Sequence, residues 1–206
     1  MVAALASWLD ARAWNNGIGG RWLVRIEDLD TTRCPDGAAN TILRQLHDCM
    51  LVPDEPPVYQ SQRREQYAQA LAQLARLNRA YPCGCSRRDI ETALLAKGVT
   101  RPRHGERIYP GTCCNGLHGK PALSWRFRVT DPAYKSACAM ALPQTDPDAQ
   151  EHHAGTRAAR VYWPDRRLGP MVQDVATEVG DFVLLRADGP FAYQLAVVVD
   201  LSLIHI

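Results

Sequence analysis

Three carboxylates follow a short apolar stretch near the start of the chain. The segment RWLVRIEDLDTTR places Glu27, Asp28 and Asp30 directly after the run WLVRI. In a parallel sheet, groups just past the carboxyl end of a strand face the crevice where ligands bind. Carboxylates at that position could hold a substrate ammonium group or Mg²⁺. Alternatively, Asp28 and Asp30 cap the next turn and pair with Arg25 and Arg33, and the acids alone favour this structural interpretation.

A second group of residues has the types and spacing of a metal site. Cys83 and Cys85 are two positions apart, and Tyr109 and Cys113 follow within the motif YPGTC. Zinc favours four ligands in a tetrahedron, and two thiolates on one turn can combine with a distant second turn to complete it. Because C-x-C is a weaker signal than paired C-x-x-C motifs, reduced structural thiols beside a packed tyrosine explain the same residues equally well.

The region between residues 87 and 107 is locally basic. Six Lys or Arg residues stand there against three acids, although the whole chain has a net charge of only +2. A positive patch suits the phosphates of a nucleic acid. A solvated loop surface explains the same charges and is the safer interpretation of this stretch alone.

The elements that must position these groups are indicated by the apolar periodicity. Residues 1–14 have helical spacing and end at the turn residues NNGIGG, and residues 22–26 are typical of a strand covered on both faces in a parallel sheet. Two more helices are expected, the second capped by Ser61. The residues expected on the inner faces of the three helices are Val2, Leu5, Trp8 and Leu9; Ile42, Leu43, Leu46 and Met50; and Tyr67, Leu71, Leu74 and Leu77. This order of elements indicates an α/β fold.

Periodicity fades from residue 80 to about 121, where Cys, Gly, Pro and Arg accumulate. We interpret this stretch as a small insertion whose hydrophobic core is too small to be stable without a cross-link such as a bound metal ion. SWRFRV then alternates like a strand, and most of residues 131–163 are expected to form loop. Order returns with a buried run at 182–185, an Asp-Gly turn at 188–189 and a second apolar run.

Composition limits the class of protein. With 206 residues and 46% hydrophobic content, the chain can bury the core of one domain or of a domain with an insertion, which excludes a disordered protein. Without a membrane-span pattern or signal peptide, a cytoplasmic protein is expected. Seven cysteines then favour reduced thiols or a metal site over a disulfide framework, and Cys34, Cys49 and Cys138 are interpreted as small apolar residues.

Several motifs in the same order resemble the glutamyl-Q tRNA(Asp) synthetases, truncated relatives of glutamyl-tRNA synthetase within the class I aminoacyl-tRNA synthetases. These motifs are RWLVRIEDLDTTR, PDGAANTILRQL, YQSQRREQYAQAL, YPCGCSRRDI, YPGTC and VGDFVLLRADGPFAYQLAVVVD. The resemblance implies a Rossmann-type parallel-sheet catalytic core with a small zinc-binding insertion. It divides the chain into a first part of the core at 1–79, the insertion at 80–121, a return to the core at 122–200 with a loop-rich 131–163, and a foreign tail at 201–206.

The resemblance also implies the site residues. Glu27 and Tyr193 occupy positions that contact the glutamate substrate in that family. Asp28 and Asp30 are expected to have structural roles. Cys83, Cys85, Tyr109 and Cys113 occupy the positions of a structural zinc site. Three neighbours could compete as zinc ligands: Cys114, His104 and His118. Because all four positions would be filled by protein, such a zinc would be structural rather than catalytic.

The implied reaction activates L-glutamate with ATP, with Mg²⁺ assisting, and transfers the glutamyl group to queuosine in the anticodon of tRNA(Asp). The basic insertion would contact the acceptor stem, and the protein would act as a monomer. The two adenylate-forming signatures of class I synthetases, a His-x-Gly-His-type element and a Lys-Met-Ser-Lys-Ser-type loop, are not found in the 206 residues. We therefore expect a chain that is incomplete at both ends, lacks the first strand of the core, contains no assignable catalytic residue and is inactive or partial.

Two other interpretations stay open. A catalytic fragment of glutamyl-tRNA synthetase would share the IED-type strand and the VVVD segment. The YPGTC motif and the sequence of the motif VGDFVLLRADGPFAYQLAVVVD favour the queuosine-modifying relative. A non-catalytic RNA-binding module stabilised by zinc would retain the cysteines and the basic residues without using glutamate or ATP.

Overall fold

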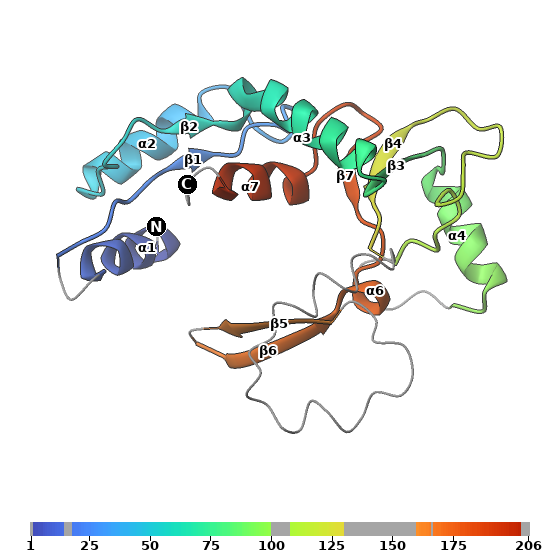
Figure 1. Ribbon diagram of the computed structural model, residues 1–206. Coiled ribbons are helices and arrows are strands. Elements are labelled where there is room, and N and C mark those ends of the chain that lie inside the picture. Colours follow the sequence, from blue (N-terminus) through green and yellow to red (C-terminus); the bar gives the residue numbers. More distant parts are fainter. Residues whose placement is uncertain (1, 15–17, 100–107, 130–159, 166, 203–206) are drawn as a thin grey trace. The chain divides into compact units, whose positions relative to one another are not determined.

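The computed structural model describes residues 2–14, 18–99, 108–129, 160–165 and 167–202. The chain divides into two compact units, Met1–Ala68 and Gln69–Ile206, and each is described by itself. None of the described helices is both long and apolar enough to span a membrane. The elements of Figure 1, in chain order, are α1 (Val2–Ala13), β1 (Arg25–Ile26), α2 (Ala38–Asp48), β2 (Val58–Tyr59), η1 (Gln60–Arg63), α3 (Arg64–Arg76), β3 (Ala80–Cys83), α4 (Arg87–Ala96), β4 (Ser124–Phe127), β5 (Arg160–Asp165), β6 (Gly169–Asp174), α6 (Val175–Glu178), β7 (Val183–Leu185) and α7 (Tyr193–Ser202).

The first unit contains a parallel strand pair. Strand β1 pairs with β2 in the register Arg25 to Val58 and Ile26 to Tyr59. The strand predicted at 22–26 therefore exists and is parallel, but only its last two residues pair. Its partner β2 lies in the proline-rich stretch after residue 52, where no strand was predicted.

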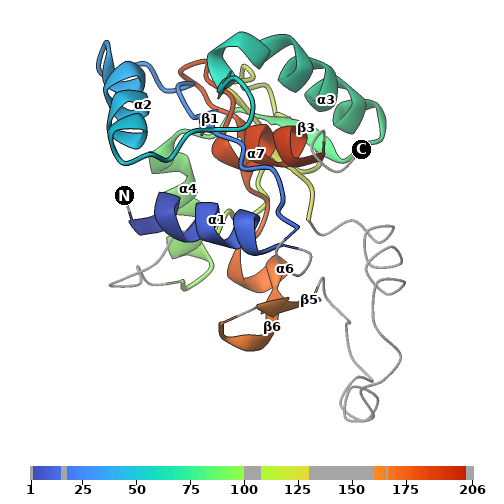
Figure 2. The same ribbon diagram turned by 90° about the vertical axis from the view of Figure 1, so that its left-hand side faces the viewer.

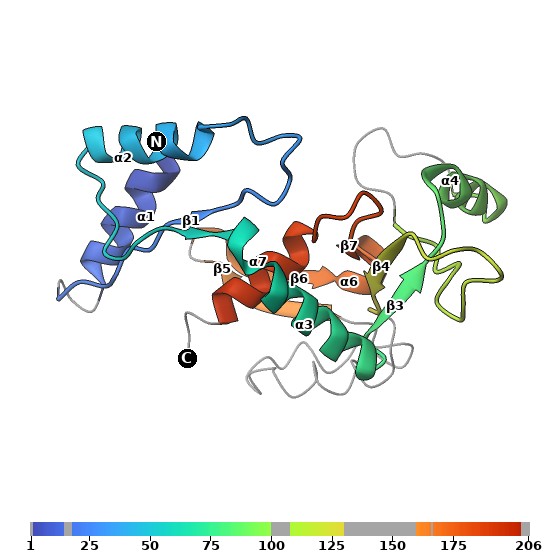
Figure 3. The same cartoon turned by 90° about the horizontal axis from the view of Figure 1, so that it is seen from above.

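The core of the first unit joins α1 to α2. Trp22, Leu46 and Leu51 are buried and packed together, and the α1 residues that contact them include Ala4 and Trp8. In Figure 3, α1 passes behind α2 and runs obliquely to it. The helix is as predicted, but its inner face is not: Val2, Leu5 and Leu9 are exposed. Small alanines allow α1 to approach the core along the face that also carries Trp8, and the larger aliphatic residues stay outside.

The next two helices differ from the prediction at their ends. Met50 lies beyond α2 with φ 60° and an 83% exposed side chain, because the helix has already ended. Ser61 does not cap α3: it lies in the 3-10 turn η1, where its hydroxyl donates to Asp28. Tyr67 and Leu71 of α3 are buried as expected, whereas Leu77 is exposed after the helix ends.

The second unit contains an antiparallel sheet with β4 in its centre. Strand β4 pairs with β3 from Ala80–Phe127 to Cys83–Ser124, and on its other side with β7. The strand predicted from SWRFRV is confirmed. The apolar run expected to be buried at 182–185 contains β7, in which Leu184 is buried. The predicted Asp-Gly turn is confirmed as well, since Gly189 donates to the Arg186 carbonyl with φ +101°.

Several elements of the second unit were not predicted, among them α4 and the strands β5 and β6. Helix α4 begins at a capping box, in which Ser86 accepts from the Asp89 N–H and the Asp89 carboxylate accepts from the Ser86 N–H. Strands β5 and β6 form a hairpin that runs directly into α6 (Figure 2), so Arg160–Trp163 is strand where loop was expected. Residues 131–159 of that predicted loop lie outside the described residues.

Candidate metal centre and substrate-binding residues

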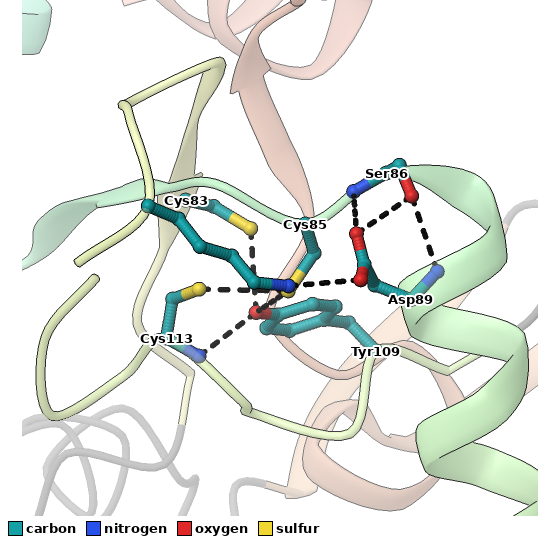
Figure 4. Close-up of polar contacts among 7 residues, drawn as sticks. Cys83, Cys85, Ser86, Asp89, Tyr109 and Cys113 are labelled. Carbon is teal, nitrogen blue, oxygen red and sulfur yellow. Dashed lines mark hydrogen bonds and ion pairs between the residues drawn. The ribbon is translucent and has the colours of Figure 1, made fainter. Parts of the chain in front are cut away.

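Two segments of the second unit bring the predicted metal ligands together. Cys83 is the last residue of β3, and Cys85 follows just before the Ser86 cap of α4. Tyr109 and Cys113 come from the segment after residue 107, where Tyr109 forms a parallel bridge with Gly180. Figure 4 shows the three sulfur atoms around the tyrosine hydroxyl.

The distances in this cluster match a tetrahedral ligand set. The Tyr109 hydroxyl oxygen lies 3.3 Å from the Cys83 sulfur and 3.4 Å from the Cys85 sulfur, and the Cys85 and Cys113 sulfurs are 3.5 Å apart. A tetrahedron with the usual Zn–S and Zn–O bond lengths has edges of about 3.8 Å between sulfurs and about 3.5 Å between sulfur and oxygen. These three distances are close to tetrahedral edges, and all three sulfurs lie within 4.8 Å of one another, which is compatible with one zinc-sized ion among the donor atoms.

The chemistry of the donor set also fits a metal. All four side chains are buried, with Cys83 0% exposed, and they form one packed cluster. Burial raises the pKa of Cys83, but hydrogen bonds with Tyr109, the Cys85 N–H and Arg126 outweigh burial and lower this pKa to about 7. Burial and the neighbouring thiols raise the pKa of Cys85 to about 11, and burial with three thiol contacts raises that of Tyr109 far above its usual range. A metal cation would displace the protons of the three thiols and of the Tyr109 hydroxyl and would be bound by the four donor atoms in their place.

The structure separates the four predicted ligands from their competitors. Within the described residues, the one group of three or more Cys, His, Asp or Glu with metal-ligand spacing is Cys83, Cys85 and Cys113, whose sulfurs lie within 4.8 Å of one another. Cys114 packs beside the cluster without joining it, and His118 is not in the group. His104 and Cys138 lie outside the described residues. Cys34 is partly buried and Cys49 is exposed, so Cys49 does not serve as a core residue.

The sequence analysis missed the role of Gly84. A Cβ atom built on Gly84 would lie 2.7 Å from the Pro121 carbonyl oxygen and 2.8 Å from the Lys120 Cβ. Glycine between the two cysteines therefore lets the chain at 120–121 cross directly over the ligand turn. The C-G-C pattern carried this signal, because a glycine between two ligands often marks a close backbone approach.

Each of the three carboxylates after β1 has a partner in the structure. Asp28 accepts from both the N–H and the hydroxyl of Ser61, at 2.8 and 2.6 Å. Asp30 pairs with Arg33 at 3.0 Å. Arg25 pairs with Glu27 at 2.9 Å rather than with Asp28, and the Glu27 side chain remains 41% exposed.

Tyr193, the other residue implied to bind glutamate, begins α7 and is 59% exposed. Glu27 belongs to the first unit and Tyr193 to the second. In the basic stretch, Arg87 and Arg88 lie in the first turn of α4, and Lys97 donates to the Pro110 carbonyl. Residues 100–107, which hold the other arginines of that stretch, lie outside the described residues.

Known proteins place this fold in a class. The family model described as the catalytic domain of class I tRNA synthetases (E and Q) matches residues 2–108. The chain therefore belongs to that family. Crystal structures of a glutamate tRNA ligase from Elizabethkingia meningosepticum, in complex with its amino acid, and of glutamate-tRNA synthetase from Elizabethkingia anophelis match 98% of the chain with TM-scores of 0.65 and 0.66. At 22% identity over 38% and 39% of those chains, this likeness confirms the Rossmann-like class I catalytic fold.

Closer relatives confirm the resemblance carried by the motifs. Proteins named glutamyl-Q tRNA(Asp) synthetase from Albidiferax ferrireducens and Burkholderia mallei are 54% and 50% identical to this chain over 97% of its length. The chain covers 62% and 57% of those relatives, so it spans somewhat more than half of their length.

Proposed function

We propose that the chain is part of an enzyme that activates L-glutamate with ATP, assisted by Mg²⁺, and transfers the glutamyl group to queuosine in the anticodon of tRNA(Asp). The observation that carries this proposal is the 50–54% identity to synthetases of that name over 97% of the chain. In the first step a carboxylate oxygen of glutamate bonds to the α-phosphorus of ATP and pyrophosphate leaves. In the second, the glutamyl group passes to queuosine and AMP leaves.

In this proposal Glu27 receives the ammonium group of glutamate. Its carboxylate is exposed just beyond the carboxyl end of a parallel strand, where ligands of α/β folds bind. The exposed phenol of Tyr193 supplies a second contact to the substrate. Replacing Glu27 with Gln should raise the KM for glutamate roughly 10- to 100-fold, because a charged hydrogen bond is lost. Asp30→Asn is the matched control, since Asp30 is paired with Arg33 and should leave that KM unchanged.

The first test is glutamate-dependent ATP–pyrophosphate exchange without tRNA. It should be run on this chain and on a version extended at both ends with the sequence of the Albidiferax ferrireducens relative. Exchange in the extended protein would support glutamate activation by this family member. No exchange in either protein would favour the RNA-binding module, which should bind tRNA with a steep salt dependence and without affinity for glutamate.

The choice of tRNA separates the proposal from a glutamyl-tRNA synthetase. The extended protein should attach glutamate to queuosine-containing tRNA(Asp) and leave tRNA(Glu) uncharged. The opposite preference would contradict the proposal while leaving the class I assignment intact. We further expect a cytoplasmic monomer, which light scattering after size exclusion would check for oligomeric state.

We also propose that Cys83, Cys85, Tyr109 and Cys113 hold a structural zinc ion. The support is the tetrahedral spacing and burial of the four donor atoms. With four protein ligands no coordination position is left for substrate, so the ion would stabilise the chain around β3 and α4. Elemental analysis of the purified protein should find about one zinc per chain if all four residues are ligands.

A further inference from the structure

Arg126 is a buried cation beside the ligand residues: it lies over the Tyr109 ring and helps to lower the pKa of Cys83. It lies in β4, the central strand, opposite Tyr81 of β3 and Val183 of β7. Only 8% of the residue is exposed. The carbon at the centre of its guanidinium group lies 3.8 Å from the centroid of the Tyr109 ring. Such a short stacking distance fixes the plane of the ring whose hydroxyl faces the three sulfurs.

The contacts of Arg126 leave its charge only partly compensated. Nη1 donates to the main-chain oxygen of Asp181 at 2.9 Å. The Asp181 carboxylate is engaged elsewhere: one oxygen accepts from the Tyr81 hydroxyl at 2.5 Å and the other from the Val129 N–H at 2.8 Å. Nε of Arg126 is buried and has no partner in hydrogen-bond geometry within the described residues. A buried cation is costly unless a negative group lies nearby.

The metal centre supplies that negative charge. Three thiolates around a divalent ion leave a net charge of −1, and a phenolate in the fourth position makes it −2. This excess would be enclosed in a cluster whose residues are 0–8% exposed, where water cannot compensate it. Lys120 is less suited to the task, because its ammonium group is bonded to Asp89 at 2.8 Å and its side chain is 42% exposed.

We propose that Arg126 is a positioning residue of the metal centre, which offsets the excess negative charge of the ligand set and holds the Tyr109 ring in its ligating orientation. This inference rests on the proposed zinc site. Residues that orient metal ligands typically change metal affinity 10- to 100-fold when they are replaced. Arg126 therefore belongs to the metal site although it donates no ligand atom.

The test compares Arg126→Gln, Arg126→Lys and the control Lys120→Gln with the unaltered chain. Lys120→Gln also removes a positive charge near the cysteines, but an exposed one. Zinc affinity is measured by competition with a chromophoric chelator, and ligand geometry by the absorption spectrum of the cobalt(II)-substituted protein. Arg126→Gln should bind zinc roughly 10- to 100-fold more weakly. Lys120→Gln should stay within about threefold, because an exposed charge is screened.

Arg126→Lys separates the two parts of the role. Lysine keeps the charge, so zinc affinity should remain within about tenfold of the unaltered chain. It lacks the planar group that stacks on Tyr109, so the cobalt spectrum should still shift. If Arg126→Gln fails to fold, the role of Arg126 is tested with Arg126→Lys alone. A cobalt spectrum of Arg126→Lys that matches the spectrum of the unaltered chain would overturn the inference.

Two failures can be told apart. If the unaltered chain takes up neither zinc nor cobalt, the metal centre itself is wrong. If the unaltered chain binds both and Arg126→Gln matches it in affinity and spectrum, the metal centre stands and Arg126 has no role in it.

Discussion

At the scale of single residues, Cys83 is the ligand that the structure encloses most completely. It is 0% exposed, and its sulfur contacts the Tyr109 hydroxyl at the centre of the cluster. Its main-chain oxygen also accepts a hydrogen bond from the Leu123 N–H, which connects the ligand turn to the segment just before β4. A change at this position therefore acts on the metal centre and on the sheet together.

Cys83→Ser should lower zinc content and melting temperature together. Serine is a poor zinc ligand, and the binding free energy of a structural metal is part of the folding free energy. For a protein of 150–250 residues, a loss of even about 1 kcal/mol corresponds to a decrease of roughly 2–4 °C in the melting temperature. Elemental analysis and calorimetry measure the two quantities on the same sample.

Cys114→Ser is the matched control for this change. Cys114 is the next residue after a ligand and packs against the cluster, but its sulfur is not in the ligand group. Its replacement should leave the zinc content unaltered. If Cys83→Ser kept its zinc and Cys114→Ser lost it, the ligand assignment would be wrong.

At the scale of elements, the ligand turn is shaped by the crossing of two chain segments. The turn between β3 and α4 contains Gly84, where an added Cβ atom would clash with the Pro121 carbonyl oxygen at 2.7 Å. A capping box then starts α4 immediately, and Lys120 donates to the same Asp89 that closes the box. The positions of both cysteines thus depend on how the Pro121 carbonyl and the Lys120 Cβ pack over Gly84.

Gly84→Ala should weaken metal binding without removing a ligand. The added methyl group would meet backbone, which yields less readily than a flexible side chain, so the turn or the crossing segment must move. Overpacking of this kind typically costs about 1–3 kcal/mol. Gly98→Ala is a suitable comparison, because Gly98 has open space around it and is strained only by its φ of +71°. Zinc competition should show a larger loss for Gly84→Ala, and equal losses would contradict the crossing argument.

In the first unit, Asp54 connects α1 to the start of the strand pair. Its carboxylate accepts from Arg12 at 2.8 and 2.9 Å and from the Trp22 N–H at 2.6 Å. The hydrogen bond from Arg12, followed by that from Trp22, lowers the pKa of Asp54 below its usual value. A carboxyl with a lowered pKa in the folded state stabilises the protein above its unfolded pKa of about 3.9.

This stabilisation should be lost as the pH falls through the lowered pKa of Asp54, when the carboxyl is protonated. Asp54→Asn should therefore lower the melting temperature at pH 7. At pH 3 the difference in melting temperature between the variant and the unaltered chain should be smaller. Thermal unfolding across this pH range measures the convergence. Parallel curves for the two proteins, with a constant difference down to low pH, would show that the charge of Asp54 has no part in holding α1.

The elements that could be predicted from the sequence are those whose apolar pattern decides their structure. α1, α2, α3, β4 and β7 were recognised in this way. β2 was missed because its residues follow consecutive prolines. α4 was missed because none of its residues is buried and only Ile90 packs against the buried cluster, so its apolar pattern is weak, although a capping box marks its start. The inner face of α1 was wrong because the alanines that permit close packing weigh little in a hydrophobic pattern.

At the scale of the whole molecule, the site was predicted better by motifs in their order than by any single spacing. The C-x-C pair and the YPGTC motif indicated the ligands, and the structure brings all four together. Arg126 could not be predicted, because an arginine in an alternating strand is expected to face solvent until its neighbours are known. Its burial depends on tertiary packing, because side chains of a strand point out of the faces of the sheet and the Tyr109 ring lies 3.8 Å from the guanidinium carbon of Arg126.

The division of the chain into two units leads to a last prediction about metal removal. All four proposed ligands belong to the second unit, together with β3, β4 and β7. Removing zinc with a chelator should therefore increase amide hydrogen exchange in β3, β4 and α4, because these segments lose the ligands that hold them. Exchange in α1 and α2, whose shared core contains no ligand, should stay the same. Mass spectrometry of peptides resolves the two responses, and Cys83→Ser should exchange like the chelated protein before any chelator is added. A rise of equal size in both units would show that the ion stabilises the molecule as a single cooperative body.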